Sequence, residues 1–120
     1  MALKHAEPGE VIDLSPLGPE LNTAKTAALV KTDAFEAVRL VVRKGISIPT
    51  HSVPGQIMLH CLEGHVELGV EPAPIILKAS EWVYLEGGAP HSVRAIENSS
   101  LLLTIFLEHT PTKHGVRLPN

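Results

Sequence analysis

Proline and glycine interrupt this chain at short intervals along its whole length. The 120 residues include ten prolines and nine glycines, which leaves little room for long helices. The segments between these breaks are short and rich in Val, Ile and Leu. In one of them Val66, Leu68 and Val70 alternate with His, Glu and Gly, and this two-residue period is typical of a strand with one buried face.

Short segments of this kind recur through most of the sequence. Eight of them are predicted to be strands, at residues 27–32, 36–43, 56–63, 65–70, 74–79, 81–86, 91–96 and 100–109. Many short strands separated by turn signals are typical of an all-β sandwich or barrel. A helix over residues 19–31, beginning after Pro19, remains an alternative for part of the N-terminal region.

Size and composition limit the classes of protein that the chain can belong to. A chain of 120 residues fits one domain, and 44% apolar with 19% charged residues indicates a folded chain. The net charge of −3, without a basic cluster, argues against a nucleic-acid partner. No apolar run is long enough to cross a membrane, and the N-terminus lacks the apolar core of a signal peptide. The single Cys61 excludes an intramolecular disulfide, so we expect a cytoplasmic protein.

The predicted strand at residues 56–63 is apolar on both faces. Ile57, Leu59 and Cys61 share one face, while Met58, His60 and Leu62 share the other. A single barrel covers only one face of a strand, so something else must cover the second one. An N-terminal arm, residues 1–30, or a second subunit can cover it, and we expect a homodimer by default.

Two spaced patterns of glycine and histidine frame the middle of the chain. In the first, Gly45 is followed after five residues by His51, and Gly64 ends the segment GISIPTHSVPGQIMLHCLEG. In the second, Gly88 and His91 lie in EGGAPHSV. Over about residues 30–107, this arrangement resembles the cupin superfamily, specifically its small single-domain bacterial members of the RmlC-like type.

The resemblance implies a cupin-type jelly-roll β-barrel at residues 31–110, commonly dimeric, followed by a C-terminal tail at 111–120. It also implies a divalent metal held by three His and one Glu. The chain departs from the family pattern at several positions. Val53 stands at the second His position and Ile57 at the Glu position; Ser80, Glu86 and Ala95 stand where the second motif has glycine, proline and asparagine.

The two retained ligand positions, His51 and His91, make an incomplete metal site. Val and Ile cannot coordinate a metal, and Zn, Fe, Ni and Mn sites normally take three or more protein donors. Gln56 and His60 are the candidate third donors, although His60 points to the opposite strand face in a regular strand. The pattern favours a divalent metal that is absent or only partly bound.

The sequence predicts a small-molecule pocket in the barrel mouth, because such mouths commonly hold ligands. The predicted lining is His51, Val53, Ile57, Leu59, Cys61 and His91. Whether the protein is an enzyme stays open. The first alternative is a metal-dependent oxygenase or isomerase using His51, His91 and an unusual third ligand; the second is a non-catalytic interaction or structural module.

Two further residues allow more than one interpretation, and a third has a single one. Arg39 would bind a carboxylate if it pointed into the barrel and would be an ordinary surface charge if it pointed outward. Tyr84 could donate a proton if it reached the mouth, but no His–Asp couple accompanies it. Glu63, in the turn before Gly64, is predicted to be structural.

Overall fold

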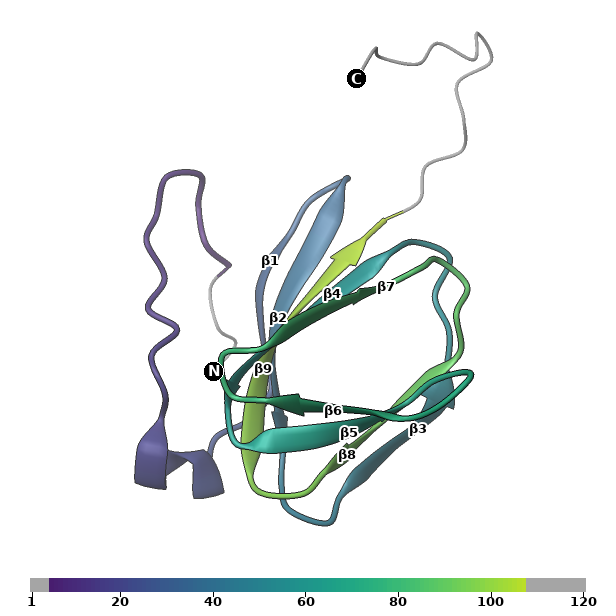
Figure 1. Cartoon of the computed structure of the whole chain (residues 1–120). Helices are drawn as coiled ribbons and strands as arrows, with labels where there is room; N and C mark the ends of the chain where they lie inside the picture. The colour runs from purple at the N-terminus through teal and green to yellow at the C-terminus, as the bar shows by residue number, and fades with distance from the viewer. Residues whose placement is uncertain (1–4, 108–120) are drawn as a thin grey trace, which may run out of the picture.

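The computed structural model describes residues 5–107, and it folds into two antiparallel β-sheets that face each other (Figure 1). A short 3-10 helix, η1 (Gly18–Asn22), precedes the strands. The strands are β1 (Ala27–Lys31), β2 (Phe35–Val42), β3 (Ser47–His51), β4 (Ile57–Glu63), β5 (His65–Gly69), β6 (Ile75–Lys78), β7 (Trp82–Leu85), β8 (His91–Ala95) and β9 (Ser99–Phe106). The predicted all-β jelly roll is confirmed. No helix among residues 5–107 is long and apolar enough to cross a membrane.

One sheet has the strand order β1-β2-β9-β4-β7 and the other β3-β8-β5-β6. Alternate residues of each strand point between the sheets, because successive side chains in a strand point to opposite faces. Leu59 of β4, Leu101 of β9 and Leu68 of β5 are almost completely buried there. The two sheets thus enclose an aliphatic core, and the alternation predicted for residues 56–63 is confirmed by the burial of β4.

Tight connections between strands depend on residues in the left-handed backbone region. Gly45, Gly64 and Gly88 have φ near +80°, and Ser80, which stands at a glycine position of the cupin pattern, has φ 75°. Glycine adopts this conformation without a steric cost, whereas serine does so at some cost. At Gly64 a Cβ atom would also overlap the backbone oxygen of Asn98.

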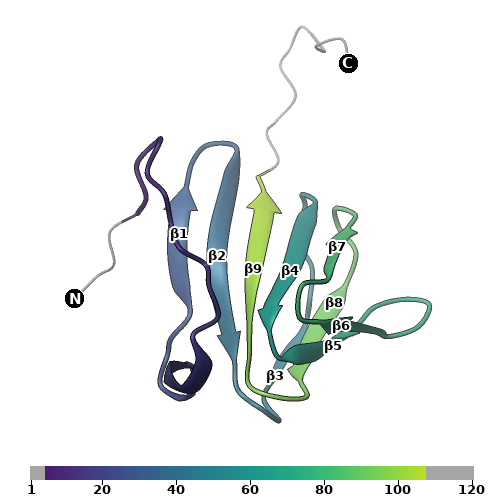
Figure 2. The ribbon, with the colours of Figure 1, turned by 60° about the vertical axis from the view of Figure 1, so that its left-hand side comes forward.

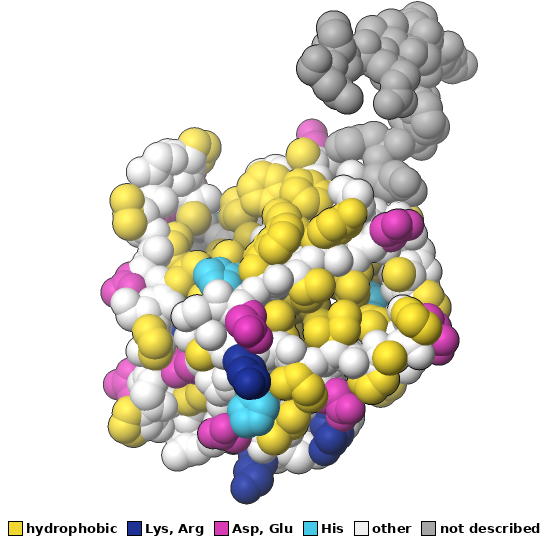
Figure 3. All heavy atoms as spheres, in the orientation of Figure 1, with side chains coloured by type: hydrophobic (Ala, Val, Ile, Leu, Met, Phe, Trp, Pro, Cys, Tyr) yellow, Lys and Arg dark blue, Asp and Glu magenta, His cyan; other side chains and the backbone are white. Residues whose placement is uncertain are grey.

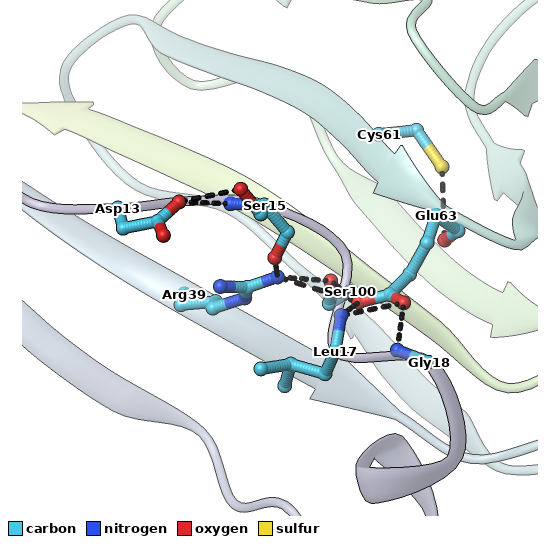
Figure 4. A network of polar contacts seen from close by, with 8 residues as sticks. All are labelled: Asp13, Ser15, Leu17, Gly18, Arg39, Cys61, Glu63 and Ser100. Carbon is cyan, nitrogen blue, oxygen red and sulfur yellow. Dashed lines mark hydrogen bonds and ion pairs between the residues drawn. The ribbon is translucent and has the colours of Figure 1, made fainter.

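The N-terminal segment lies across the outer face of the five-stranded sheet, near β1 and β2 (Figure 2). It is held by a network of polar contacts around Glu63 (Figure 4). The N–H groups of Leu17 and Gly18 donate to Glu63 Oε1 at 3.0 and 3.2 Å, and Ser100 Oγ donates to Oε2 at 2.6 Å. Arg39 Nη2 donates to Glu63 Oε2 at 3.3 Å and to Ser15 O at 2.8 Å.

This network corrects both interpretations of Arg39. Its side chain points away from the barrel interior, yet the residue is only 8% exposed. It is neither a ligand-binding group in the barrel nor an ordinary surface charge, because the N-terminal segment covers it. Arg39 Nε is the one buried side-chain nitrogen or oxygen in residues 5–107 without a hydrogen-bond partner.

The structure corrects three interpretations of the sequence, which concern a strand, a helix and the boundary of the N-terminal arm. Residues 47–51 form a ninth strand, β3, which was not predicted. Residues 19–31 do not form a helix, since η1 is followed by the strand β1. The predicted boundary at residue 30 falls inside β1, so the arm that lies outside the sheets is shorter. The tail at 111–120 and the end of the last predicted strand lie outside the described residues.

Candidate functional site

Two histidines from neighbouring strands form the polar part of the candidate site. His51 is the last residue of β3 and His91 the first residue of β8, and the two are direct partners in the antiparallel pairing of these strands. Their ring centroids lie 4.4 Å apart with an interplanar angle of 58°. Because β3 ends where β8 begins, strand pairing alone brings together two residues forty positions apart.

Backbone carbonyl groups fix the orientation of both imidazoles. Nδ1 of His51 lies 3.0 Å from Pro49 O, and Nδ1 of His91 lies 3.0 Å from Ala89 O. A carbonyl oxygen can only accept a hydrogen bond, so each Nδ1 carries a proton. In a neutral imidazole the other nitrogen, Nε2, then holds a free lone pair. Both histidines therefore offer an acceptor atom, or a metal ligand, at Nε2.

A cavity of about 170 Å³ lies between the sheets beside the two histidines. Its other lining residues are all aliphatic: Leu40, Ile48, Ile57, Leu59, Val93 and Leu103. The site therefore combines one polar edge with an apolar interior, as small-molecule pockets commonly do. His51 is exposed, whereas His91 is 5% exposed, so the polar edge runs from the surface inward.

Four of the six residues predicted to line a pocket meet in this cavity, namely His51, Ile57, Leu59 and His91. Val53 packs against the core but does not line the cavity, and Cys61 is fully buried farther along β4. Burial raises the pKa of the Cys61 thiol to about 11. Prediction from the sequence missed Ile48, Val93, Leu40 and Leu103. Val93 shares the parity of His91 in β8, so that signal was available. Ile48 differs in parity from His51, because the register of β3 shifts between these two residues.

The donor set does not fit a metal site of three or more protein ligands. Among residues 5–107, no three His, Cys, Asp or Glu side chains gather closely enough to hold an ion. Ile57, at the glutamate position of the cupin pattern, is buried in the cavity wall. His60 lies on the opposite face of β4, paired with Leu102 and Trp82. Gln56 is exposed and is not among the cavity residues.

A second surface feature lies on the outer face of the five-stranded sheet. Strand pairing places an uncharged set of side chains there, which we call the outer patch: Phe35, Ala37, Met58, His60, Trp82, Tyr84, Leu102, Thr104 and Phe106. Trp82 is 54% and Tyr84 51% exposed, and their rings lie 6.2 Å apart. Figure 3 shows hydrophobic side chains gathered over β4, β7 and the end of β9. Tyr84 thus points away from the barrel mouth.

Comparison with known proteins identifies the fold. No protein-family model matches the chain, and no curated protein matches it. Solved structures do match. A conserved protein of unknown function from Streptococcus pyogenes superposes with a TM-score of 0.70 at 20% identity, covering 92% of this chain and 97% of that one. A cupin superfamily protein from Desulfitobacterium hafniense matches with a TM-score of 0.68 at 13% identity, covering 82% and 100%.

A cupin 2 conserved barrel domain protein from Leptotrichia buccalis is 28% identical over 68% of this chain and 40% of that one, with a TM-score of 0.65. These neighbours share the two-sheet jelly roll described above. The predicted resemblance to a small cupin is thus confirmed, and the chain has the cupin fold. The same fold carries many chemistries, so function has to be argued from the site.

Proposed function

We propose that this protein binds a small molecule in the barrel mouth, at His51 and His91. The observation that carries the proposal is the meeting of two oriented imidazoles with an aliphatic cavity of about 170 Å³. Both Nδ1 atoms are engaged by backbone carbonyls, so both Nε2 atoms are left for a ligand. Binding, rather than metal-dependent catalysis, is favoured because the described donors fall short of a metal site.

The test is a thermal-shift screen of a metabolite library against the full chain and a His51→Ala, His91→Ala double variant. A ligand present at a hundredfold excess over its Kd should stabilise the wild-type protein by about 2.7 kcal/mol. For a domain of this size that corresponds to a rise in Tm of roughly 10 °C. The double variant should show no rise. Equal shifts in both proteins would contradict the proposal, because the ligand would then bind elsewhere.

A matched control uses a histidine outside the cavity. His65 lies at the start of β5, where its Nδ1 is 2.8 Å from Glu97 Oε2. His65→Ala removes an imidazole from the surface without touching the cavity, so the ligand-induced shift should remain. Elemental analysis of protein purified without a histidine tag tests the alternative. Stoichiometric metal that disappears in the double variant would favour the metal-dependent enzyme instead.

We also propose that the outer patch binds a second copy of this chain. The patch contains no Lys, Arg, Asp or Glu, so two copies can face each other without bringing like charges together. Exposed aromatic residues in a contiguous apolar area are typical of interfaces. Light scattering should give about twice the chain mass of 12.9 kDa.

Trp82→Arg places a charge in the outer patch of each copy and should give monomers. Ile76→Arg is the control, because Ile76 is 45% exposed on the other sheet. A monomeric wild-type protein at about 100 µM, or a Trp82→Arg variant that stays dimeric, would contradict this part of the proposal. Neither outcome affects the proposed ligand site.

A further inference from the structure

The chemistry of the cavity narrows the kind of ligand that fits it. We infer that the barrel mouth takes a neutral molecule with one ring-sized apolar body and a hydroxyl group, of the class of simple phenols and cyclic alcohols. This inference rests on the proposed function, since it concerns the same cavity. The proposed function names only a small molecule, and the inference specifies the polarity, the charge and the size of that molecule.

The first argument is that the polar edge offers the ligand hydrogen-bond acceptors and no donors. The carbonyl groups of Pro49 and Ala89 hold a proton on each Nδ1, which leaves Nε2 of each neutral ring as an acceptor. No described residue donates to either Nε2. The ligand therefore has to supply the hydrogen-bond donor, and a hydroxyl group can do so. A carboxylate brings only acceptor atoms, and its lone pairs would face those of Nε2.

The second argument is that these acceptors can be reached. In the described part of the chain, the only buried side-chain nitrogen or oxygen without a partner is Arg39 Nε. Nε2 of His91 makes no hydrogen bond there, so it is open to the cavity or to solvent rather than sealed in the core. His51 beside it is exposed. A hydroxyl can thus contact the pair from the side of the entrance.

The third argument is the size and polarity of the remaining wall. An apolar cavity of about 150 Å³ lined by Leu, Ile and Phe binds benzene, and this cavity measures about 170 Å³. One six-membered ring therefore fits within this volume. The wall residues Ile57, Leu59 and Val93 carry no hydrogen-bonding side-chain atoms. A polar substituent at the far end of the ligand would lose its water without gaining a partner.

Direct observation of the imidazole nitrogens tests this inference. Long-range proton–nitrogen NMR of the histidine-labelled full chain, at pH 8 where an ordinary histidine is neutral, follows Nε2 of His51 and His91. Phenol should shift at least one of these signals in a saturable way. Anisole has the same ring but no donor, and it should bind at least about tenfold more weakly. Benzoate should not bind at this pH.

Two variants connect the signals to the site. His51→Ala removes an exposed residue, so the fold is expected to persist, and it should weaken phenol binding by about tenfold. His65→Ala should leave phenol binding unchanged. Anisole that binds as tightly as phenol would overturn the donor requirement, and benzoate that binds more tightly would overturn the ligand class; in both cases the proposed ligand site stands. If no probe shifts either histidine, and the library screen also gives nothing, both the inference and the proposed function fail.

Discussion

Replacing Glu63 by Gln should release the N-terminal segment from the barrel and destabilise the protein. The Glu63 carboxylate accepts hydrogen bonds from Leu17 N–H, Gly18 N–H and Ser100 Oγ, and it pairs with Arg39 Nη2 at 3.3 Å. All these partners are donors. The amide group of Gln has nearly the same shape, but it carries no charge and presents an NH₂ group where one of the oxygens was.

The expected loss is about 3 kcal/mol in the free energy of unfolding at pH 7. Removing one partner of a buried ion pair costs about 3–5 kcal/mol, because the other charge is left uncompensated. The side chains of Arg39 and Glu63 are 10% and 12% exposed, so the lower end of that range applies. Nε of Arg39 already lacks a hydrogen-bond partner, so the guanidinium group has little capacity to replace the lost carboxylate with another acceptor. For a domain of this size the Tm should fall by roughly 10 °C.

The same contacts predict a pH dependence. Burial alone would raise the pKa of Glu63, but the hydrogen bonds from Ser100, Leu17 and Gly18 and the charge of Arg39 hold that pKa below its ordinary value of 4.5. A carboxylate with a lowered pKa in the folded state stabilises the protein above its unfolded pKa. That contribution is lost as the pH falls through the folded value. The stability difference between wild type and Glu63→Gln should therefore shrink below about pH 4.5.

Urea denaturation from pH 7 to pH 3 measures this difference, and hydrogen exchange of residues 5–24 reports release of the segment. The control is Glu97→Gln, whose carboxylate contacts His65 but is 63% exposed; it should cost less than about 1 kcal/mol. A loss below 1 kcal/mol for Glu63→Gln would refute the reasoning. So would a difference that stays constant down to pH 3, or unchanged exchange in the N-terminal segment.

Three further predictions concern backbone conformation and thiol reactivity. Ser80→Gly should stabilise the protein by up to about 1 kcal/mol in urea denaturation. The strain energy of serine at φ 75° is removed, and this gain exceeds the free-energy cost of the extra conformational entropy of the unfolded chain. Gly64→Ala should destabilise the protein by about 2 kcal/mol or more, since the new Cβ would overlap Asn98 O, and an unchanged stability would contradict the described turn. The Cys61 thiol, fully buried and with its pKa raised to about 11, should react with an aromatic disulfide at pH 8 only in denaturant; fast labelling of the native protein would show that β4 opens locally.

The sequence predicted the core strands well, because their side chains alternate between a buried and a less buried face. In β4 the period of two is complete, with Ile57, Leu59 and Cys61 inside, and register follows directly from such a pattern. The strand β3 lacks this signal. Only Ile48 is partly buried in it, and Pro49 lies in its middle. Proline is tolerated there because β3 is an edge strand that pairs with β8 alone.

The surroundings of Arg39 could not be predicted from strand parity. Parity correctly separates inward from outward residues, but it does not say whether another segment covers the outward face. The partners of Arg39 include Ser15, 24 residues earlier, and Ser100, 61 residues later. A weak signal was present, because Arg39 lies on a face that also carries Phe35 and Ala37. An apolar outer face is itself an indication that something packs on it.

The candidate site combines a predictable part with one that depends on the tertiary structure. Spacing predicted that His51 and His91 lie near each other, since both occupy positions of a known pattern. Their tautomers follow from the carbonyl groups of Pro49 and Ala89, each two residues before its histidine. Such short-range contacts are set by local backbone geometry and do not require a metal. The histidine pair is therefore oriented by the chain itself. This explains how Ile57 can replace a ligand and join the apolar wall while both Nε2 atoms stay available to another kind of partner.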